Sequence, residues 1–146
     1  MDLIHFIASD DRNGLNCGVF FIRVHPWSLN FLMRSTSYFY YHQEKFLTWA
    51  DQSSMNNVLT GSNDTDEHYV IVPQHWFNRY FHNKKKGEFL VHLAGKRSKT
   101  EKARIFRSEI RNDSDWYTAI TNRDLRKQVL EYYDLPKEKQ HRISIQ

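Results

Sequence analysis

Short apolar runs that alternate with helix-like segments constrain the fold of this chain more than any other feature. The runs at residues 3–8, 19–22, 69–72 and 88–93 have the length of β-strands, and Pro73 ends the third of them. Strands interleaved with helices are typical of α/β domains. The sequence therefore predicts an α/β fold, with the run at 19–22 covered on both faces because it is continuously apolar.

Several local signals predict where helices begin. Pro26 suits the first turn of a helix through residues 27–33, and a second helix is expected over residues 44–59 with Phe46 on its apolar side. Two further helices are expected after capping-box patterns, and the last of them carries an apolar stripe that predicts a core contact. The capping residues and the stripe are Ser98, Glu101, Thr121, Asp124, Leu125, Val129, Leu130 and Tyr133.

Length and composition predict one globular domain. A chain of 146 residues fits a single core, expected over residues 1–133, and residues 134–146 have the composition of a polar tail. Residues 9–14 are expected to form a polar turn. The single Cys17 excludes an intrachain disulfide and is expected to be a small buried residue rather than a reactive thiol. There is no apolar run near 18 residues, so no transmembrane helix is expected.

Positive charge is concentrated in one part of the chain. Residues 79–111 contain 11 Lys or Arg against 3 Asp or Glu, within a chain of net charge +4. Such a block fits nucleic acid, an anionic membrane surface, a phosphate-bearing small ligand or a solvated face without a partner. The run from Lys84 to Lys86 is interpreted as a solvated loop.

One segment has the residue types needed to hold a metal ion and a diphosphate. The apolar strand expected over residues 88–93 contains His92 and is followed by Gly95 and Lys96. An imidazole can ligate a metal, glycine lets the backbone approach phosphate oxygens, and lysine supplies a cation. The alternative for His92 is an ordinary core histidine.

Five sequence blocks follow one another in a set order. They are Asn16-Cys17-Gly18-Val19-Phe20-Phe21-Ile22-Arg23, Pro26-Trp27-Ser28, Asp51-Gln52-Ser53, Gln74-His75-Trp76-Phe77-Asn78 and Phe89-Leu90-Val91-His92-Leu93-Ala94-Gly95. Together they resemble the galactosyl/mannosyltransferase family that includes fungal Golgi mannosyltransferases and plant xyloglucan xylosyltransferases. The amino acids at residues 15–18 and 25–28 are most similar to those of fungal α-1,6-mannosyltransferases.

The resemblance implies the C-terminal half of a GT-A fold, a mixed sheet with flanking helices, and a retaining hexosyltransferase that uses a nucleotide sugar and Mn²⁺. It assigns His92 to the metal, Gly95 and Lys96 to the diphosphate, Asp51 and Gln52 to the reacting sugars, and Asn16 and Gly18 to the donor sugar. Asp51 can stabilise an oxocarbenium-like transition state, attack as a nucleophile or orient the acceptor. Asn16 can instead shape a turn. Trp76 to Asn78 are expected to pack beneath the site, and the alternative for them is contact with the acceptor.

The chain departs from the family pattern in one respect. The family's metal-binding Asp-x-Asp precedes the strand of Asn16, and no such motif precedes Asn16 here. Asp64-Thr65-Asp66 and Asp113-Ser114-Asp115 have the spacing but come later and are interpreted as coincidental, and Asp10-Asp11 is assigned to the turn. Activity of this chain alone is therefore in question.

The resemblance implies transfer of mannose from GDP-mannose to a mannan-type glycan in the Golgi lumen, with a type II membrane anchor outside this chain. The alternatives are a UDP-galactose-dependent galactosyltransferase and a non-catalytic subunit or truncated product of a mannan-synthesising complex. The expected partners are the nucleotide sugar, the glycan acceptor and subunits of such a complex. Nucleic-acid binding by residues 79–111 is a third hypothesis, which the order of the motifs opposes.

Overall fold

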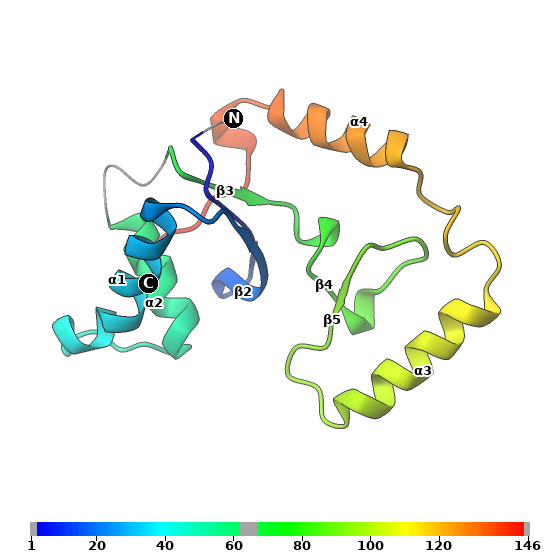
Figure 1. Ribbon diagram of the computed structural model, residues 1–146, viewed down its shortest axis with the longest axis horizontal. Coiled ribbons are helices and arrows are strands. Elements are labelled where there is room, and N and C mark those ends of the chain that lie inside the picture. Colours follow the sequence, from blue (N-terminus) through cyan, green and yellow to red (C-terminus); the bar gives the residue numbers. More distant parts are fainter. Residues whose placement is uncertain (1–2, 62–66, 145–146) are drawn as a thin grey trace. The chain divides into compact units, whose positions relative to one another are not determined.

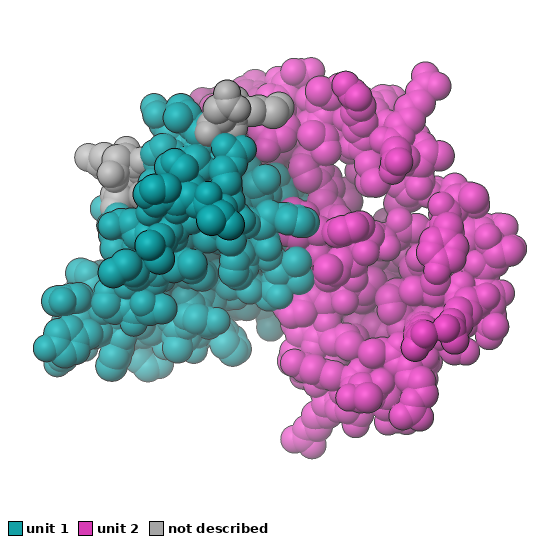
Figure 2. All heavy atoms as spheres, in the orientation of Figure 1, with its two compact units in different colours: residues 1–74, 141–146 teal, residues 75–140 magenta. Residues whose placement is uncertain are grey.

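The computed structural model describes residues 3–61 and 67–144 and divides the chain into two compact units (Figure 2). Unit 1 comprises residues 1–74 and 141–146, and unit 2 comprises residues 75–140. Asp64-Thr65-Asp66 lies outside the described residues. Each unit has its own architecture.

Unit 1 is built on a mixed sheet of strands β1 (Phe6–Asp11), β2 (Gly14–Ile22) and β3 (Tyr69–Val72) (Figure 1). Their order is β2-β1-β3: β1 and β2 form an antiparallel hairpin, and β1 and β3 run parallel. The strand predicted before Pro73 has the predicted bounds. The mixed sheet and its helices confirm the expected α/β fold class and are compatible with part of a glycosyltransferase fold.

The turn of the hairpin is tighter than the sequence predicted. Residues 9–11, expected in a polar turn, continue β1 because they pair with residues 14–16 of β2. Asp11 Oδ1 accepts a hydrogen bond from the Asn13 N–H at 2.7 Å, and Gly14 has a φ of +93°, a region that favours glycine. The assignment of Asp10-Asp11 to the turn was wrong, because both residues lie in β1, although the Asp11 side chain does bind the turn.

The apolar run in β2 is covered on one face rather than on both. Phe20 packs against the core, whereas the next side chain, Phe21, is 48% exposed. The prediction of burial on both faces was wrong because successive side chains of a strand point to opposite faces, and the face of Phe20 meets the core while the face of Phe21 is exposed.

The helices of unit 1 are α1 (Pro26–Tyr41) and α2 (Ala50–Thr60), which pack against each other. Pro26 occupies the first turn of α1, as predicted, but the helix extends well beyond residue 33. The helix expected over residues 44–59 begins later, because Trp49 has an extended backbone and forms the N-cap of α2. Phe46, expected on its apolar side, precedes the helix and is 89% exposed.

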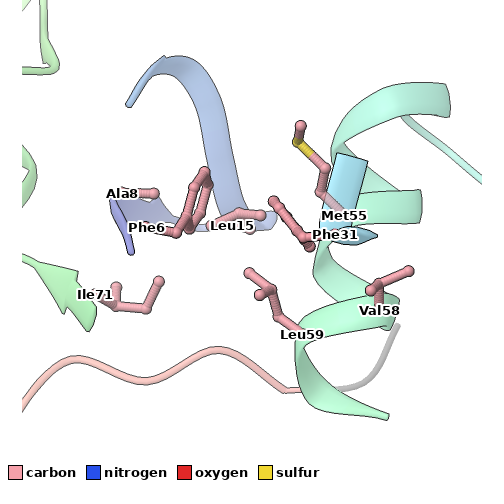
Figure 3. Close-up of a cluster of buried hydrophobic side chains, with 8 residues drawn as sticks. All are labelled: Phe6, Ala8, Leu15, Phe31, Met55, Val58, Leu59 and Ile71. Atoms are coloured by element: carbon pink, nitrogen blue, oxygen red, sulfur yellow. The ribbon is translucent and has the colours of Figure 1, made fainter. Parts of the chain in front are cut away.

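The core of unit 1 lies between the sheet and both helices (Figure 3). Phe6 and Phe31 are nearly inaccessible, and their ring centroids are 5.0 Å apart in a tilted arrangement. Burial of apolar surface supplies most of the favourable free energy of such a cluster. The cluster consists of Phe6, Ala8 and Leu15 from the hairpin, Phe31 from α1, Met55, Val58 and Leu59 from α2, and Ile71 from β3.

A group of histidine rings lies beside this core. His5 is buried, stacks on His25 with ring centroids 3.9 Å apart, and lies 5.2 Å from the ring of His68. Its Nδ1 has no hydrogen-bond partner within residues 3–61 and 67–144. Burial lowers the pKa of His5, and electrostatic interactions with His25, His68 and Arg23 lower it further. His5 is therefore neutral in the folded protein near neutral pH.

We expect acid to destabilise the chain through His5. Its folded-state pKa lies below the value of 6.5 for an unperturbed histidine, so below that pH the unfolded state takes up the proton first. The free energy of unfolding should therefore fall as the pH drops below 6.5 and should reach its full value above it. His5→Gln should reduce this pH dependence in urea titrations from about pH 5 to about pH 8.

The pH dependence of stability that remains in His5→Gln is expected to come from His75 of unit 2. The pKa of His75 is also lowered, chiefly by burial. An unchanged pH dependence in the variant would contradict the role assigned to His5.

Unit 2 has a two-stranded parallel sheet of β4 (Arg79–Tyr80) and β5 (Val91–His92) and the helices α3 (Lys99–Asn112) and α4 (Asn122–Tyr133) (Figure 1). The strand expected over residues 88–93 is thus shorter, because only the pairs with Arg79 and Tyr80 form. Short 3-10 turns occur at Gln74–Trp76, Phe81–Asn83 and Lys137–Lys139.

The two predicted capping boxes have different outcomes. Thr121 and Asp124 exchange both hydrogen bonds of a capping box at the start of α4, as predicted. Ser98 precedes α3 as expected but has a φ of +55° and makes no side-chain cap, so the first box was wrong.

The apolar stripe of α4 is not a core contact. Leu130 and Tyr133 are exposed and Leu125 and Val129 are half-buried, whereas Tyr132 is buried and packs edge-on against Trp76. The prediction was wrong because helical spacing fixes which side chains share a face but not what lies opposite that face.

The end of the chain returns to unit 1. The Asn56 side chain donates a hydrogen bond to the carbonyl of Ser144 at 2.7 Å, and His141 lies 2.7 Å from Asp10. The division into residues 1–133 and a tail stays a prediction. No helix in the described part of the chain has the length and apolar character needed to cross a membrane.

Candidate functional site

Two side-chain amides of α2 bind the outer edge of β2 and organise the predicted site residues of unit 1. Gln52 Oε1 accepts the Cys17 N–H at 3.1 Å, and Asn56 Oδ1 accepts the Leu15 N–H at 3.1 Å. Alternate strand residues lie roughly 6.8 Å apart. Helix residues four apart lie about 6 Å apart along the axis. The two spacings match, so one helix face satisfies the two N–H groups of this edge strand.

Asn16 and Gly18 are joined to each other on β2. Asn16 Oδ1 accepts the Gly18 N–H at 2.9 Å, and Asn16 Nδ2 donates to Asp11 Oδ2 at 2.8 Å. Asn16 is buried, so its amide fixes the conformation of the strand and connects it to the hairpin turn. Asn16 lies within β2 rather than in a turn, and its contact with a sugar stays a prediction.

Asp51 places a carboxylate in the first turn of α2. It is exposed, and its Oδ1 accepts the N–H of Gln52 at 2.9 Å. The positive end of the helix dipole attracts a negatively charged side chain at this position. Asp51 can therefore present negative charge beside the segment of β2 that Gln52 holds.

The thiol of Cys17 is kept protonated. Burial, and then the negative charge of Asp51, raises the pKa of Cys17 to about 12. Its sulfur lies 3.3 Å from that of Met55, against the core. Cys17 thus behaves as the small apolar residue that the sequence suggested, and it is no nucleophile near neutral pH.

The predicted diphosphate residues form a turn after β5. His92 is half-buried on the strand, with its ring centroid 5.8 Å from that of Tyr80. Gly95 has a φ of +59°, and a Cβ added there would meet no atom within 4 Å. Lys96 makes no ion pair within the described ranges, and its N–H donates to the Leu93 carbonyl at 3.4 Å. Glycine here suits the backbone conformation and leaves open space beside the turn.

The block at residues 76–78 packs within unit 2, because Phe77 and Asn78 are buried and Trp76 packs on Tyr132. Its position beneath the site stays a prediction. Asp113-Ser114-Asp115 binds Lys86 through both carboxylates, with Lys86 Nζ 2.7 Å from Asp113 and 3.8 Å from Asp115. That geometry supports a coincidental Asp-x-Asp spacing.

The seven predicted site residues fall into two groups. Asn16, Gly18, Asp51 and Gln52 come together in unit 1 around β2 and the start of α2. His92, Gly95 and Lys96 follow one another in unit 2. Among the described residues, no cluster of three or more His, Cys, Asp or Glu side chains is arranged to hold a metal ion. The described residues therefore do not fit a complete metal centre, and His92 can supply one ligand at most.

Sequence reasoning missed Asn56, which is fully buried and holds both β2 and the returning end of the chain. A usable signal was present, because Gln52 and Asn56 are side-chain amides four residues apart on one helix face. The pattern does not reveal which strand such a pair binds.

The fold and the two groups of polar residues suit a nucleotide-sugar-dependent transferase, and a comparison with protein families supports that class. A family model of glycosyltransferases matches residues 2–103 and so includes all seven site residues. It describes the galactosyl transferase GMA12/MNN10 family, and the chain belongs to this family. No curated protein and no solved structure gives a significant match.

Proposed function

We propose that this chain is part of a retaining, Mn²⁺-dependent hexosyltransferase that moves mannose from GDP-mannose onto a mannan-type glycan. The observation that carries the proposal is the family match, which spans both groups of predicted site residues. The choice of mannose as the donor sugar rests on the amino acids at residues 15–18 and 25–28, which resemble those of fungal α-1,6-mannosyltransferases.

The turn after β5 takes the leaving diphosphate in this proposal. A diphosphate gains negative charge as the glycosidic bond breaks, and preorganised cations and amide groups lower the energy of that state. Lys96 supplies a positive charge that is not bound to another described residue, and Gly95 leaves its backbone accessible beside open space. Bound Mn²⁺ would supply Lewis-acid stabilisation of the diphosphate, with His92 as one ligand.

In this proposal, the residues at the contact between β2 and α2 bind the reacting sugars. Asp51 is exposed at a helix N-terminus, so its charge can stabilise positive character at the anomeric carbon or orient the acceptor hydroxyl. Gln52 is a positioning residue, because its carbonyl oxygen is bound to the backbone of β2. The proposed location is the lumenal side of the Golgi membrane, where the family's fungal relatives act.

The proposal is tested by calorimetric titration of the chain with GDP and with UDP, each with and without Mn²⁺. We expect Mn²⁺-dependent binding that favours GDP and weakens at least tenfold in His92→Ala. His82→Ala is a matched control, because His82 also lies 5.8 Å from the ring of Tyr80 but is exposed. It should bind as the wild type does.

The other outcomes separate the alternatives. Preferential binding of UDP would replace the mannosyl proposal with the galactosyl one. No nucleotide binding by a folded chain that still captures subunits of a mannan-synthesising complex would favour the non-catalytic role. Equal losses in His92→Ala and His82→Ala would contradict the assignment of His92 to the metal.

A further inference from the structure

A cavity in unit 2 lies between β5 and α3 and is separate from the predicted donor residues. It has a volume of about 420 Å³, and its apolar lining includes the half-buried side chains of Val91, Leu93, Phe106 and Ile110. Cavities of this size hold drug-sized ligands. The apolar lining provides a surface for the face of a ring.

Two arginines place positive charge at this cavity. Arg107 and Arg111 both line it, four residues apart on α3, and both are exposed. Neither forms an ion pair with another described residue. Like charges at this spacing disfavour a helix slightly. The presence of two arginines here is readily explained if both guanidinium groups bind one anion, because each group can donate two hydrogen bonds to phosphate oxygens.

Neighbouring acidic groups do not neutralise this pair, because they bind other cations. Glu109 lies 3.4 Å from Lys84, and Asp113 lies 2.7 Å from Lys86. Asp115 also faces Lys86, at 3.8 Å. The positive charge at the cavity is therefore uncompensated, in contrast to the lysines of the nearby loop.

The cavity also has an aromatic side chain suited to a ring. Tyr117 lines it and is 77% exposed, so its ring face is open to stacking. An apolar wall, one exposed aromatic ring and two guanidinium groups complement a molecule that has a ring at one end and a phosphate at the other.

The side chain of His92 does not line this cavity. Within β5, Val91 and His92 point to opposite faces, as successive strand residues do. Val91 and Leu93 both line the cavity, and His92 between them does not. Gly95 and Lys96 do not line it either, so the cavity is a different site from the proposed diphosphate turn.

We propose that the cavity between β5 and α3 binds a phosphate monoester attached to a sugar or nucleoside ring, without a metal ion. The two guanidinium groups bind the phosphate, and the ring lies between the apolar wall and Tyr117. The ligand is therefore either a sugar phosphate or a nucleoside monophosphate, which share this chemistry.

The test is calorimetric titration of the whole chain in EDTA with glucose 6-phosphate, GMP, glucose, guanosine and inorganic phosphate. We expect one or both monoesters to bind, and the neutral sugar, the nucleoside and inorganic phosphate to bind at least tenfold more weakly. The stronger of glucose 6-phosphate and GMP identifies the ring. Inorganic phosphate that binds as tightly as both esters would overturn the proposal, and so would the absence of binding by either ester.

Variants locate the site. Arg107→Gln and Arg111→Gln should each weaken the binding of the ester about tenfold, the loss expected for one charge-assisted contact. Arg104→Gln is the matched control, since Arg104 is exposed on the same helix but does not line the cavity. An equal loss in Arg104→Gln would mean nonspecific attraction to a basic helix and would overturn the proposal.

His92→Ala should bind the ester as the wild type does, because the titration contains no divalent metal. This result separates the cavity from the proposed donor site. Failure of Mn²⁺-dependent GDP binding would leave the expectations for glucose 6-phosphate and GMP unchanged.

Discussion

Replacing Glu88 with alanine is expected to destabilise unit 2 by about 3–5 kcal/mol, the range found when one partner of a buried ion pair is removed. The Glu88 side chain is only 3% exposed and pairs with Arg79, which is 20% exposed. Its second oxygen accepts the Lys85 N–H at 2.8 Å. Without Glu88, the Arg79 charge stays largely desolvated and has no counterion.

The effect should extend to the strand that carries His92. Arg79 begins β4, which pairs with β5 over only two residues, so the ion pair ties β4 to the segment that leads into β5. Urea denaturation measures the loss of stability. Hydrogen exchange of peptides from residues 76–93 should show that protection is lost there.

An exposed pair provides the control for Glu88. Glu131 pairs with Lys127 four residues earlier on α4, with both side chains more than half exposed. Glu131→Ala should cost less than about 0.5 kcal/mol, as is usual for surface ion pairs. Similar losses in Glu88→Ala and Glu131→Ala would show that the pair with Arg79 does not support the unit.

Asn56→Ala is expected to lower the free energy of unfolding by about 2–4 kcal/mol, because a buried polar group left without a partner costs roughly 1–3 kcal/mol and an ordinary lost hydrogen bond about 1 kcal/mol. The variant leaves the buried N–H of Leu15 without its partner and also loses the hydrogen bond to the carbonyl of the exposed Ser144. Urea titration measures the loss, and hydrogen exchange at Leu15 should become faster.

Two variants sharpen the test of Asn56. Asn56→Asp keeps an acceptor for the N–H of Leu15 but loses the donor to the carbonyl of Ser144. Its loss of stability should also include the cost of burying the new carboxylate charge. Asn30→Ala is the matched control, because Asn30 is exposed on α1 of the same unit, and it should change stability by no more than about 0.5 kcal/mol. A small loss for Asn56→Ala would mean that the end of the chain and the edge of β2 find other partners, which contradicts the proposed contact.

The elements that sequence predicted well depend on signals within a few residues. Pro73 ends β3 because proline cannot continue the strand's hydrogen bonding. Pro26 begins α1, and Thr121 caps α4 with Asp124 three residues later. Each of these signals acts locally, so the distant parts of the chain do not alter it.

The elements that sequence predicted poorly depend on what packs against them. The stripe of α4 and the position of Phe46 have apolar spacing in the sequence, yet several of these side chains are exposed. Residues 9–11 are polar but continue a strand, because the hairpin partner pairs with them. Local composition describes a face but not its neighbour.

By itself the sequence determined the α/β class, the family and the seven candidate site residues, because these follow from local patterns and from the order of short motifs. Only the tertiary structure decided that Gln52 and Asn56 hold the edge of β2 and that Glu88 forms a buried ion pair. It alone also revealed that Arg107 and Arg111 share a cavity with β5. The reason is physical: hydrogen bonds, desolvated charges and cavities depend on groups that are distant in sequence, and their partners are fixed only when the chain has folded.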